Sequence, residues 1–482
     1  MTRSIMSNFA KLSMSGLLSL LICVGINAQQ RWSLQQCVEY ATQNSIAVKQ
    51  AQNQIRNTEL QLKQNQANRL PQINASTGGN IQFGRTIDPT TNSFNSQNIT
   101  SNSLSLSAGV PVYNGGQIKN SIKQSRIDVE AIRYDAATTA NNIALSVAAG
   151  YLNVLLAEEQ LAIAKTQLDQ SRLQLTQTEK LIEAGARPRN ERLDAQAQVA
   201  LNEQTVVDAE NQVILNTLSL KQLMLLDPAQ ELLIERPQIT VPVSANPDAF
   251  VLEEIYVGAM GTQPQILAGL KRRESAIVGI DLAKAGMLPS LSFFGNLNSY
   301  ASSRAYNYSF TNQRISQTAF FNGQPVTFEI ESQIPVQLNK QAWADQINQN
   351  FGQSLGMQLS IPIFNNNRNR INMERAKINV IGVELTNQQA QQQLKTDIQT
   401  AIANARAARR SLLAAQAAEE ASRLALENAQ QRFEIGAANQ LDFNTARNNL
   451  SRAQMDLTRA KYQYVFNVKQ VEFYQGKKIT LN

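Results

Sequence analysis

The sequence predicts an α+β membrane protein in which one helix–strand–strand–helix unit occurs twice. Three observations on the 482-residue chain lead to this class: two halves align in register, four segments alternate between apolar and polar residues, and two long runs lack proline. Alternation with a period of two is typical of strands with two different faces, whereas long runs without proline are typical of helices.

Residues 1–28 have the features of a secretory signal peptide. Arg3 and Lys11 are the only charged residues there, and an apolar stretch from Leu17 to Ile26 precedes the small residue Ala28. This stretch is about half of the ~20 residues that a membrane-spanning helix needs, so we expect cleavage rather than an anchor. In the rest of the sequence, no run of about 18 apolar residues indicates a transmembrane helix.

The cysteine, histidine and charge content excludes several classes of function. The chain has no histidine, which removes histidine-based catalysis and histidine metal sites. Cys37 is the single cysteine after the signal peptide, so we expect no disulfide within the chain. A lipoprotein signal would acylate Cys23, but the bulky Ile22 before it disfavours that signal. Removal of Arg3 and Lys11 lowers the net charge from +7 to +5, and the basic residues do not cluster with aromatic ones, so no nucleic-acid partner is indicated.

The remaining chain divides into two halves with the same layout, residues 29–247 and 248–482. Leu34 aligns with Leu252 near the start of each half, and Pro111 aligns with Pro362 farther along. The second pair is more widely separated than the first, so the second half contains an insertion. It belongs to the stretch 300–352, which is rich in Asn, Gln, Ser and aromatic residues. A variable loop on a fixed frame fits this pattern.

Four segments are predicted to be strands, at about residues 72–84, 102–113, 290–300 and 353–364. In the second segment, Leu104, Leu106 and Ala108 alternate with serine, and the other three segments alternate in the same way. About ten residues suffice to cross a bilayer at a tilt. A soluble sandwich would need more strands or a covering layer of helices, so we favour membrane strands. Their uncharged Ser, Asn and Gln face implies a wet lumen.

The longest helix is predicted over 117–183, where a rise of about 1.5 Å per residue gives roughly 100 Å. Apolar residues recur every seven positions from Ala140 to Ile182, which is typical of coiled-coil packing. Gly185 and Gly436 are expected to end the long helices of the two halves, because glycine accepts the left-handed turn past a helix end. The other predicted helices are residues 33–69, 190–226, 248–287 and 439–475.

Prolines mark the junctions between elements and the link between the halves. Pro71 and Pro289 are expected to end helices where strands begin, because the residue before proline avoids the helical conformation. Pro111 and Pro362 are expected to end strands, because proline has no N–H to donate. Four further prolines keep the linker 227–247 from forming a regular helix.

Four strands are too few to close a barrel, since the smallest outer-membrane barrels have about eight. An open sheet edge in lipid would leave backbone groups unpaired, each at a cost of several kcal/mol. We therefore expect the chain to assemble with copies of itself around the lumen.

The signal peptide, the paired halves, the junctions LP…VPVYNGG and LP…SIPIFNNN and the glycine-bearing turns resemble the TolC family of outer-membrane efflux ducts. The resemblance covers essentially the whole mature chain. It implies a homotrimer that closes a 12-stranded β-barrel, continued by a long α-helical coiled-coil barrel that reaches into the periplasm.

The implied function is the outer-membrane exit duct of a tripartite efflux or type I secretion system. Its implied partners are a periplasmic adaptor (membrane fusion protein), an inner-membrane pump of RND or ABC type, and outer-membrane lipid. No cofactor is implied.

The resemblance assigns two groups of site residues. It implies that the helix turns Gly185-Ala186 and Gly436-Ala437 contact the adaptor. It also implies that the periplasmic aperture is formed by Asp442, Thr445, Glu191 and Phe433. A ring of Asp442 carboxylates from the assembled copies would favour cations in a narrow passage.

Three positions depart from the family pattern at the aperture. Thr445 stands where an acid is often found, Phe433 lacks the hydroxyl of the usual aromatic residue, and Ala438 replaces a basic latch partner. We therefore expect either a weaker closed state or a different lock.

Two other classes of protein remain as alternatives. An enzyme is disfavoured, because the sequence has no paired cysteines and no phosphate-binding glycine loop, so no catalytic or metal-binding residue is assigned. A secreted structural coiled-coil protein of the cell envelope, without pore activity, would explain the heptads. It would not explain four amphipathic strands or the paired prolines.

Overall fold

The computed structural model describes residues 31–87, 92, 94–95, 98–236 and 246–477. The predicted signal peptide lies outside these residues, and so does the part of the predicted linker from 237 to 245. The described chain forms two units. A helical unit contains the chain up to Asn57, Glu130–Arg272 and the chain from Glu384, and a sheet unit contains Thr58–Val129 and Arg273–Val383.

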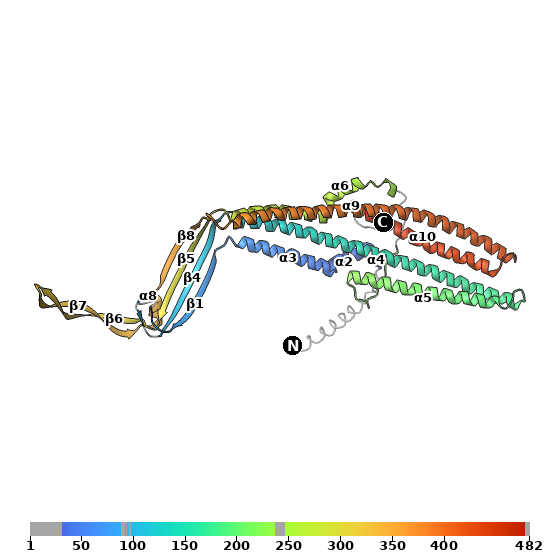
Figure 1. Cartoon of the computed structure of the whole chain (residues 1–482). Coiled ribbons are helices and arrows are strands. Elements are labelled where there is room, and N and C mark those ends of the chain that lie inside the picture. Colours follow the sequence, from blue (N-terminus) through green and yellow to red (C-terminus); the bar gives the residue numbers. More distant parts are fainter. Residues whose placement is uncertain (1–30, 88–91, 93, 96–97, 237–245, 478–482) are drawn as a thin grey trace, which may run out of the picture. The chain divides into compact units, whose positions relative to one another are not determined.

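The main elements follow one another in the same order in both halves of the chain (Figure 1). The first half contains α2 (Leu34–Asn44), α3 (Ile46–Ala67), β1 (Gln72–Gln82), β4 (Ile99–Asn114), α4 (Gln117–Glu183) and α5 (Glu191–Met224). The second half contains α6 (Leu252–Thr262), α7 (Pro264–Ala285), β5 (Ser290–Ser302), β8 (Gly352–Ser360), α9 (Arg368–Glu434) and α10 (Gln440–Tyr474). Leu34 and Leu252, which align in the sequence, are the first residues of α2 and α6. α4 and α9 begin and end at the same spacing that separates Pro111 from Pro362. The register of the sequence alignment is therefore also the register of the elements.

Each of the two predicted helical segments, 33–69 and 248–287, consists of two helices with a break between them. Ser45 separates α2 from α3 with a ψ of 131°, and Gln263 separates α6 from α7 with a ψ of 120°. Gln263 precedes Pro264, and the residue before proline avoids the helical conformation. Ser45 precedes an isoleucine, so nothing in the local sequence marks the first break.

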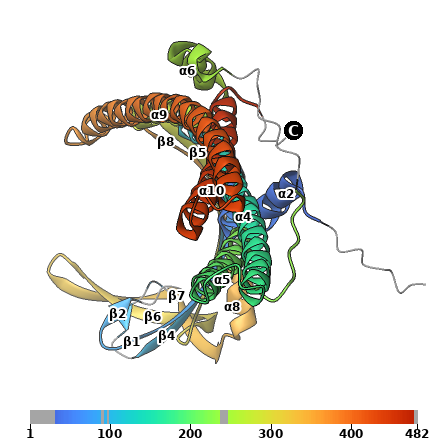
Figure 2. The ribbon, with the colours of Figure 1, turned by 90° about the vertical axis from the view of Figure 1, so that its right-hand side faces the viewer.

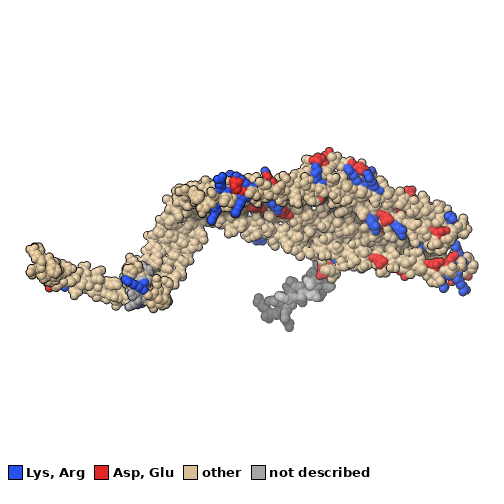
Figure 3. Space-filling view, in the orientation of Figure 1, with Lys and Arg blue, Asp and Glu red and all other residues tan. Residues whose placement is uncertain are grey.

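The sheet unit is built on a four-stranded antiparallel sheet with the order β1-β4-β5-β8. Leu106 of β4 lies opposite Ala75 of β1 and Leu297 of β5, so apolar residues share one face. On the other face, Ser105 lies opposite Ser76 with the two hydroxyl oxygens 2.7 Å apart. These four strands contain no charged residue, and their surface in Figure 3 is correspondingly without charge. The sheet has one apolar face and one uncharged polar face.

Three of the four proline junctions lie where a strand begins or has just ended. Pro71 directly precedes β1, Pro289 directly precedes β5, and Pro362 follows the last residue of β8, Ser360. Between the end of α3 at Ala67 and Pro71 the chain leaves the helix, as expected for residues that lead into a proline.

Pro111 lies inside a strand, and the prediction that it ends one is wrong. β4 continues to Asn114, with a register shift between Pro111 and Tyr113 on the side of β5. β1 begins opposite Gly109, so Pro111 lies beyond the part of β4 that pairs on both sides. An irregular pairing at this point tolerates a residue without an N–H.

The stretch 300–352, expected to be a loop, is mostly regular. It contains β6 (Tyr306–Phe321), β7 (Gln324–Lys340) and α8 (Trp343–Gln349). β6 and β7 pair with each other in a separate two-stranded antiparallel sheet. Asn322 and Gly323 form the turn between them, both with positive φ, which is the backbone that an Asn-Gly hairpin turn requires. Along β7, Val326, Phe328 and Ile330 alternate with polar residues. Both signals are present in the sequence and identify the hairpin.

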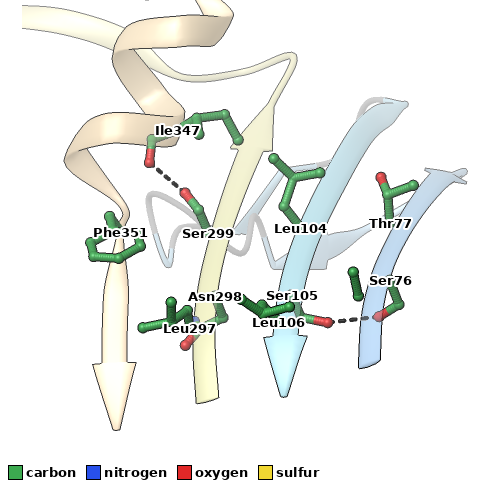
Figure 4. A pocket seen from close by; sticks show the side chains of 11 residues that line it. Ser76, Thr77, Leu104, Ser105, Leu106, Leu297, Asn298, Ser299, Ile347 and Phe351 are labelled. Carbon is green, nitrogen blue, oxygen red and sulfur yellow. Dashed lines mark hydrogen bonds between the residues drawn. The ribbon is translucent and has the colours of Figure 1, made fainter. Parts of the chain in front are cut away.

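α8 packs on the apolar face of the four-stranded sheet (Figure 4). The hydroxyl of Ser299 donates to the carbonyl of Ile347 at 2.6 Å, and the side-chain oxygen of Gln346 accepts the N–H of Ser302 at 2.7 Å. A cavity of about 480 Å³ lies beneath α8, with Leu104 and Phe351 among the residues that line it. The short helix thus covers part of the apolar face near the end of β5.

The helical unit holds most of the buried apolar residues. Val147 and Tyr151 of α4 pack with Leu220 and Met224 of α5 and with Cys37 of α2. A second cluster joins α6, α7, α9 and α10. Figure 2 shows these long helices nearly end on, with α5 beside α4 and α9 beside α10. The heptad pattern of α4 therefore marks helix packing.

One stretch of α4 is long and apolar enough to cross a membrane, judged by length and composition alone. Of this stretch, 39% is buried within the chain, and Val147 and Val154 belong to the core between α4 and α5. Packing in the helical unit therefore explains part of its apolar composition. That no helix of the mature chain crosses the membrane stays a prediction.

Candidate functional site

Each of the two long helices ends in a left-handed glycine turn. Gly185 follows α4 with a φ of +72°, and the N–H of Ala186 donates to the carbonyl of Leu181 at 2.8 Å. Gly436 follows α9 with a φ of +76°, and the N–H of Ala437 makes the equivalent bond at 2.7 Å. These bonds satisfy carbonyls that a helix end leaves without partners. The two predicted turns therefore have the same backbone form.

Both turns present small or apolar residues to solvent. A Cβ atom at Gly185 or Gly436 would meet no heavy atom of the described residues within 4 Å. Beside the second turn, Ile435 is 80% exposed and Leu441 is 72% exposed. Exposed apolar side chains beside an uncrowded backbone suit a contact with another protein.

Arg187 joins the first turn to the second. Its guanidinium lies 4.4 Å from the ring centroid of Phe433 and 3.6 Å from the carboxylate of Glu191. Phe433 stacks on Phe443 with a centroid distance of 5.4 Å. The guanidinium of Arg447 lies 5.8 Å from the Phe443 ring. Two arginines and two phenylalanines thus form a row that connects the α4–α5 turn with α9 and α10.

The structure brings together two of the predicted aperture residues through a residue that was not predicted. Glu191 and Phe433 both contact Arg187, whereas the basic partner that the resemblance expects at position 438 is an alanine. Arg187 and Glu191 are four residues apart, but Arg187 precedes α5, so no helical spacing rule indicates their ion pair. Nothing in the sequence indicates the contact with Phe433, since the two residues belong to different halves.

Asp442 and Thr445, the other two predicted aperture residues, lie in the first two turns of α10. Asn439 caps this helix, because its side-chain oxygen accepts the N–H of Asp442 at 2.8 Å. The carboxylate of Asp442 is therefore not the cap. It is exposed, and its negative charge is favourable near a helix N-terminus. The hydroxyl of Thr445 donates to the carbonyl of Leu441 at 2.8 Å, which ties it to its own helix.

The chain matches the family model described as outer membrane efflux protein over residues 38–224 and 256–477. No curated protein matches it at a significant level of sequence similarity.

Among solved structures, a crystal structure of CusC matches with a TM-score of 0.71 and 17% identity, over 92% of each chain. The CmeC outer membrane channel of Campylobacter jejuni matches with a TM-score of 0.68 and 18% identity, over 92% of this chain and 85% of its own. The outer membrane protein VceC of Vibrio cholerae matches with a TM-score of 0.69 and 16% identity, over 92% of this chain and 96% of its own. At these identities the likeness concerns the fold. Because the family model spans both halves, the chain belongs to the outer membrane efflux protein family.

Proposed function

We propose that three copies of this outer-membrane efflux channel join their four-stranded sheets into one 12-stranded barrel. The observation that carries the proposal is the sheet itself, in which β1 and β8 are the two edge strands. Edge strands expose backbone groups that in lipid must be paired. Pairing β8 of one copy with β1 of the next, around a three-fold axis, satisfies both edges.

The two faces of the sheet support its place in a barrel wall. Leu355, Met357 and Leu359 of β8 are 79%, 72% and 61% exposed in the single chain, and they alternate with polar residues such as Ser354. An apolar face toward lipid and an uncharged polar face toward a wet lumen are the pattern of a transmembrane barrel. A secreted structural coiled coil has no use for such a sheet, and the family assignment also favours the channel.

The helical unit supplies the periplasmic part of the duct and its contacts. The turns Gly185-Ala186 and Gly436-Ala437 meet a periplasmic adaptor, which connects the duct to an inner-membrane pump of RND or ABC type. Asp442 carboxylates from the three copies line the aperture. Arg187, held by Glu191 and Phe433, takes the place of the missing basic latch residue and ties the two turns of each copy together.

A matched pair of substitutions on β8 tests the barrel. Leu355→Lys places a charge on the apolar face, which costs about 2–4 kcal/mol near the middle of a bilayer. Ser354→Lys places the same charge on the polar face, where water solvates it. We expect the mass of the detergent-extracted complex to equal three chains for wild type and Ser354→Lys, with a large loss of this species for Leu355→Lys. A monomeric wild type, or equal loss in both variants, contradicts the barrel.

A further inference from the structure

A cavity of about 460 Å³ in the helical unit is lined by residues of α4, α9 and α10. Small-molecule pockets have volumes of roughly 300–1,000 Å³. Ile163, Leu450 and Leu457 supply apolar surface to the lining, and Gln167 and Arg447 supply polar groups. The cavity therefore has the size and the mixed lining of a site for an amphiphilic molecule.

Arg447 is a buried cation that forms no ion pair with a described residue. Arg447 is 8% exposed, and burial lowers the pKa of its guanidinium. In the described part of the chain its contact is with the ring of Phe443, and no carboxylate pairs with it. Burying a charge without a partner is unfavourable. Among the described residues, the positive charge of Arg447 therefore has no ion-pair partner within the cavity.

Gln167, which also lines the cavity, has a second donor without a partner. Its side-chain nitrogen is buried and has no hydrogen-bond partner among the described residues. Buried donors of this kind are rare in folded proteins. Gln167 lies on α4 and Arg447 on α10, so two helices from different halves of the chain each contribute a donor. Together they indicate an acceptor that does not belong to the chain.

Two carboxylates limit which acceptor fits. Glu159 is exposed and Glu419 is half-exposed, and both line the cavity. Their charge disfavours an anion with several negative charges, such as inorganic phosphate. A molecule with one carboxylate and a hydrocarbon chain fits better. Its carboxylate contacts Arg447 and Gln167, and its hydrocarbon chain contacts the leucines.

We propose that this cavity binds an amphiphilic carboxylate, with its head group on Arg447 and Gln167 and its chain against Ile163, Leu450 and Leu457. Guanidinium and carboxylate match in geometry and form short, strong paired hydrogen bonds. All residues that line the site come from one chain.

Hexanoate binding to the full chain in lipid nanodiscs tests the proposal, with hexanol as the uncharged ligand of equal chain length. We expect wild type to bind hexanoate at least about tenfold more tightly than hexanol. Arg447→Gln removes this preference and Arg447→Lys keeps part of it. Arg452→Gln, which removes an exposed arginine of the same helix, leaves it unchanged. A wild type without the preference, or an Arg447→Gln variant that retains it, overturns the proposal.

Two further experiments test the proposal if the Arg447→Gln variant does not fold. They are hexanoate binding to Gln167→Leu and the melting temperature of Arg447→Met without ligand. Gln167→Leu is expected to weaken hexanoate binding several-fold, because the substitution removes the amide that holds the head group. Unchanged binding would overturn the contact between the head group and Gln167. Arg447→Met removes an uncompensated buried charge, so its melting temperature without ligand is expected to rise. A fall in melting temperature means that Arg447 serves packing on Phe443, and it overturns the proposal.

Discussion

At the scale of single residues, Arg187 links two turns that are far apart in the sequence. The contact with Phe433 is a cation–π interaction, worth about 0.5–1 kcal/mol when exposed. In the ion pair with Glu191, the Arg187 side chain is 23% exposed and the Glu191 side chain is 18% exposed. Ion pairs at a surface contribute about 0.2–1 kcal/mol to stability. Neither energy is large, so the link can hold the turns together and still be broken when a partner binds.

Loss of the Arg187 side chain is predicted to loosen both turns at once. Arg187→Gln removes the charge that contacts Glu191 and Phe433, so backbone amides of 181–191 and 432–442 exchange their hydrogens several-fold faster. Hydrogen exchange followed by mass spectrometry measures this. Arg189→Gln is the control, since Arg189 is exposed two residues away. Unchanged exchange in Arg187→Gln would show that the turns are held by other contacts.

Cys37 is predicted to be inert in the folded protein. It is fully buried, and burial raises the pKa of its thiol from 9.0 to about 12. Because the folded state holds the proton more tightly, this group lowers stability as the pH rises above 9.0 toward 12. At pH 8 a maleimide should label Cys37 after unfolding in guanidinium and not before. Labelling of the folded protein would mean that the core between α2 and α4 opens.

At the scale of elements, the predictions succeed where the pattern is local. Alternating Leu and Ser locate β4, and Gly185 and Gly436 locate the ends of α4 and α9. The errors have physical reasons. Pro111 lies beyond the part of β4 that pairs with strands on both sides. Where that part ends depends on where β1 begins. The row from Arg187 to Arg447 depends on tertiary contacts between the two halves, which no local pattern encodes.

The β6–β7 hairpin shows a different kind of error, since its signals were present. Asn322-Gly323 with alternating residues on both sides predicts a hairpin, yet the length of the insertion relative to the first half favoured a variable loop. A stretch that is absent from the other half of a repeat can still be a regular element.

Removal of this hairpin is predicted to leave the four-stranded sheet intact. β6 and β7 pair only with each other among the described strands, and the N–H of Gln341 donates to the carbonyl of Ala305 at 2.9 Å across the hairpin base. An Asn-Gly turn can therefore replace residues 306–340 without strain. We expect the variant to form the same oligomer in similar yield, measured by its mass in detergent. Loss of the oligomer would mean that the hairpin contributes to assembly.

At the scale of the whole molecule, the sheet requires other copies of the chain. Four uncharged strands with an exposed apolar face are unstable as an open sheet in lipid, whereas copies joined edge to edge have no open edge. In the assembly that we propose, equivalent Asp442 residues lie around one axis, and we expect their carboxylates to act together on any ion that passes.

Single-channel conductance of the purified oligomer in a planar bilayer tests the central claim that the chain forms a duct. We expect discrete conductance steps that prefer cations, and a clear loss of this preference in Asp442→Ala, because the substitution removes the acidic ring. An equal preference in the variant would place the aperture elsewhere. No conductance from folded and inserted protein would contradict the duct itself.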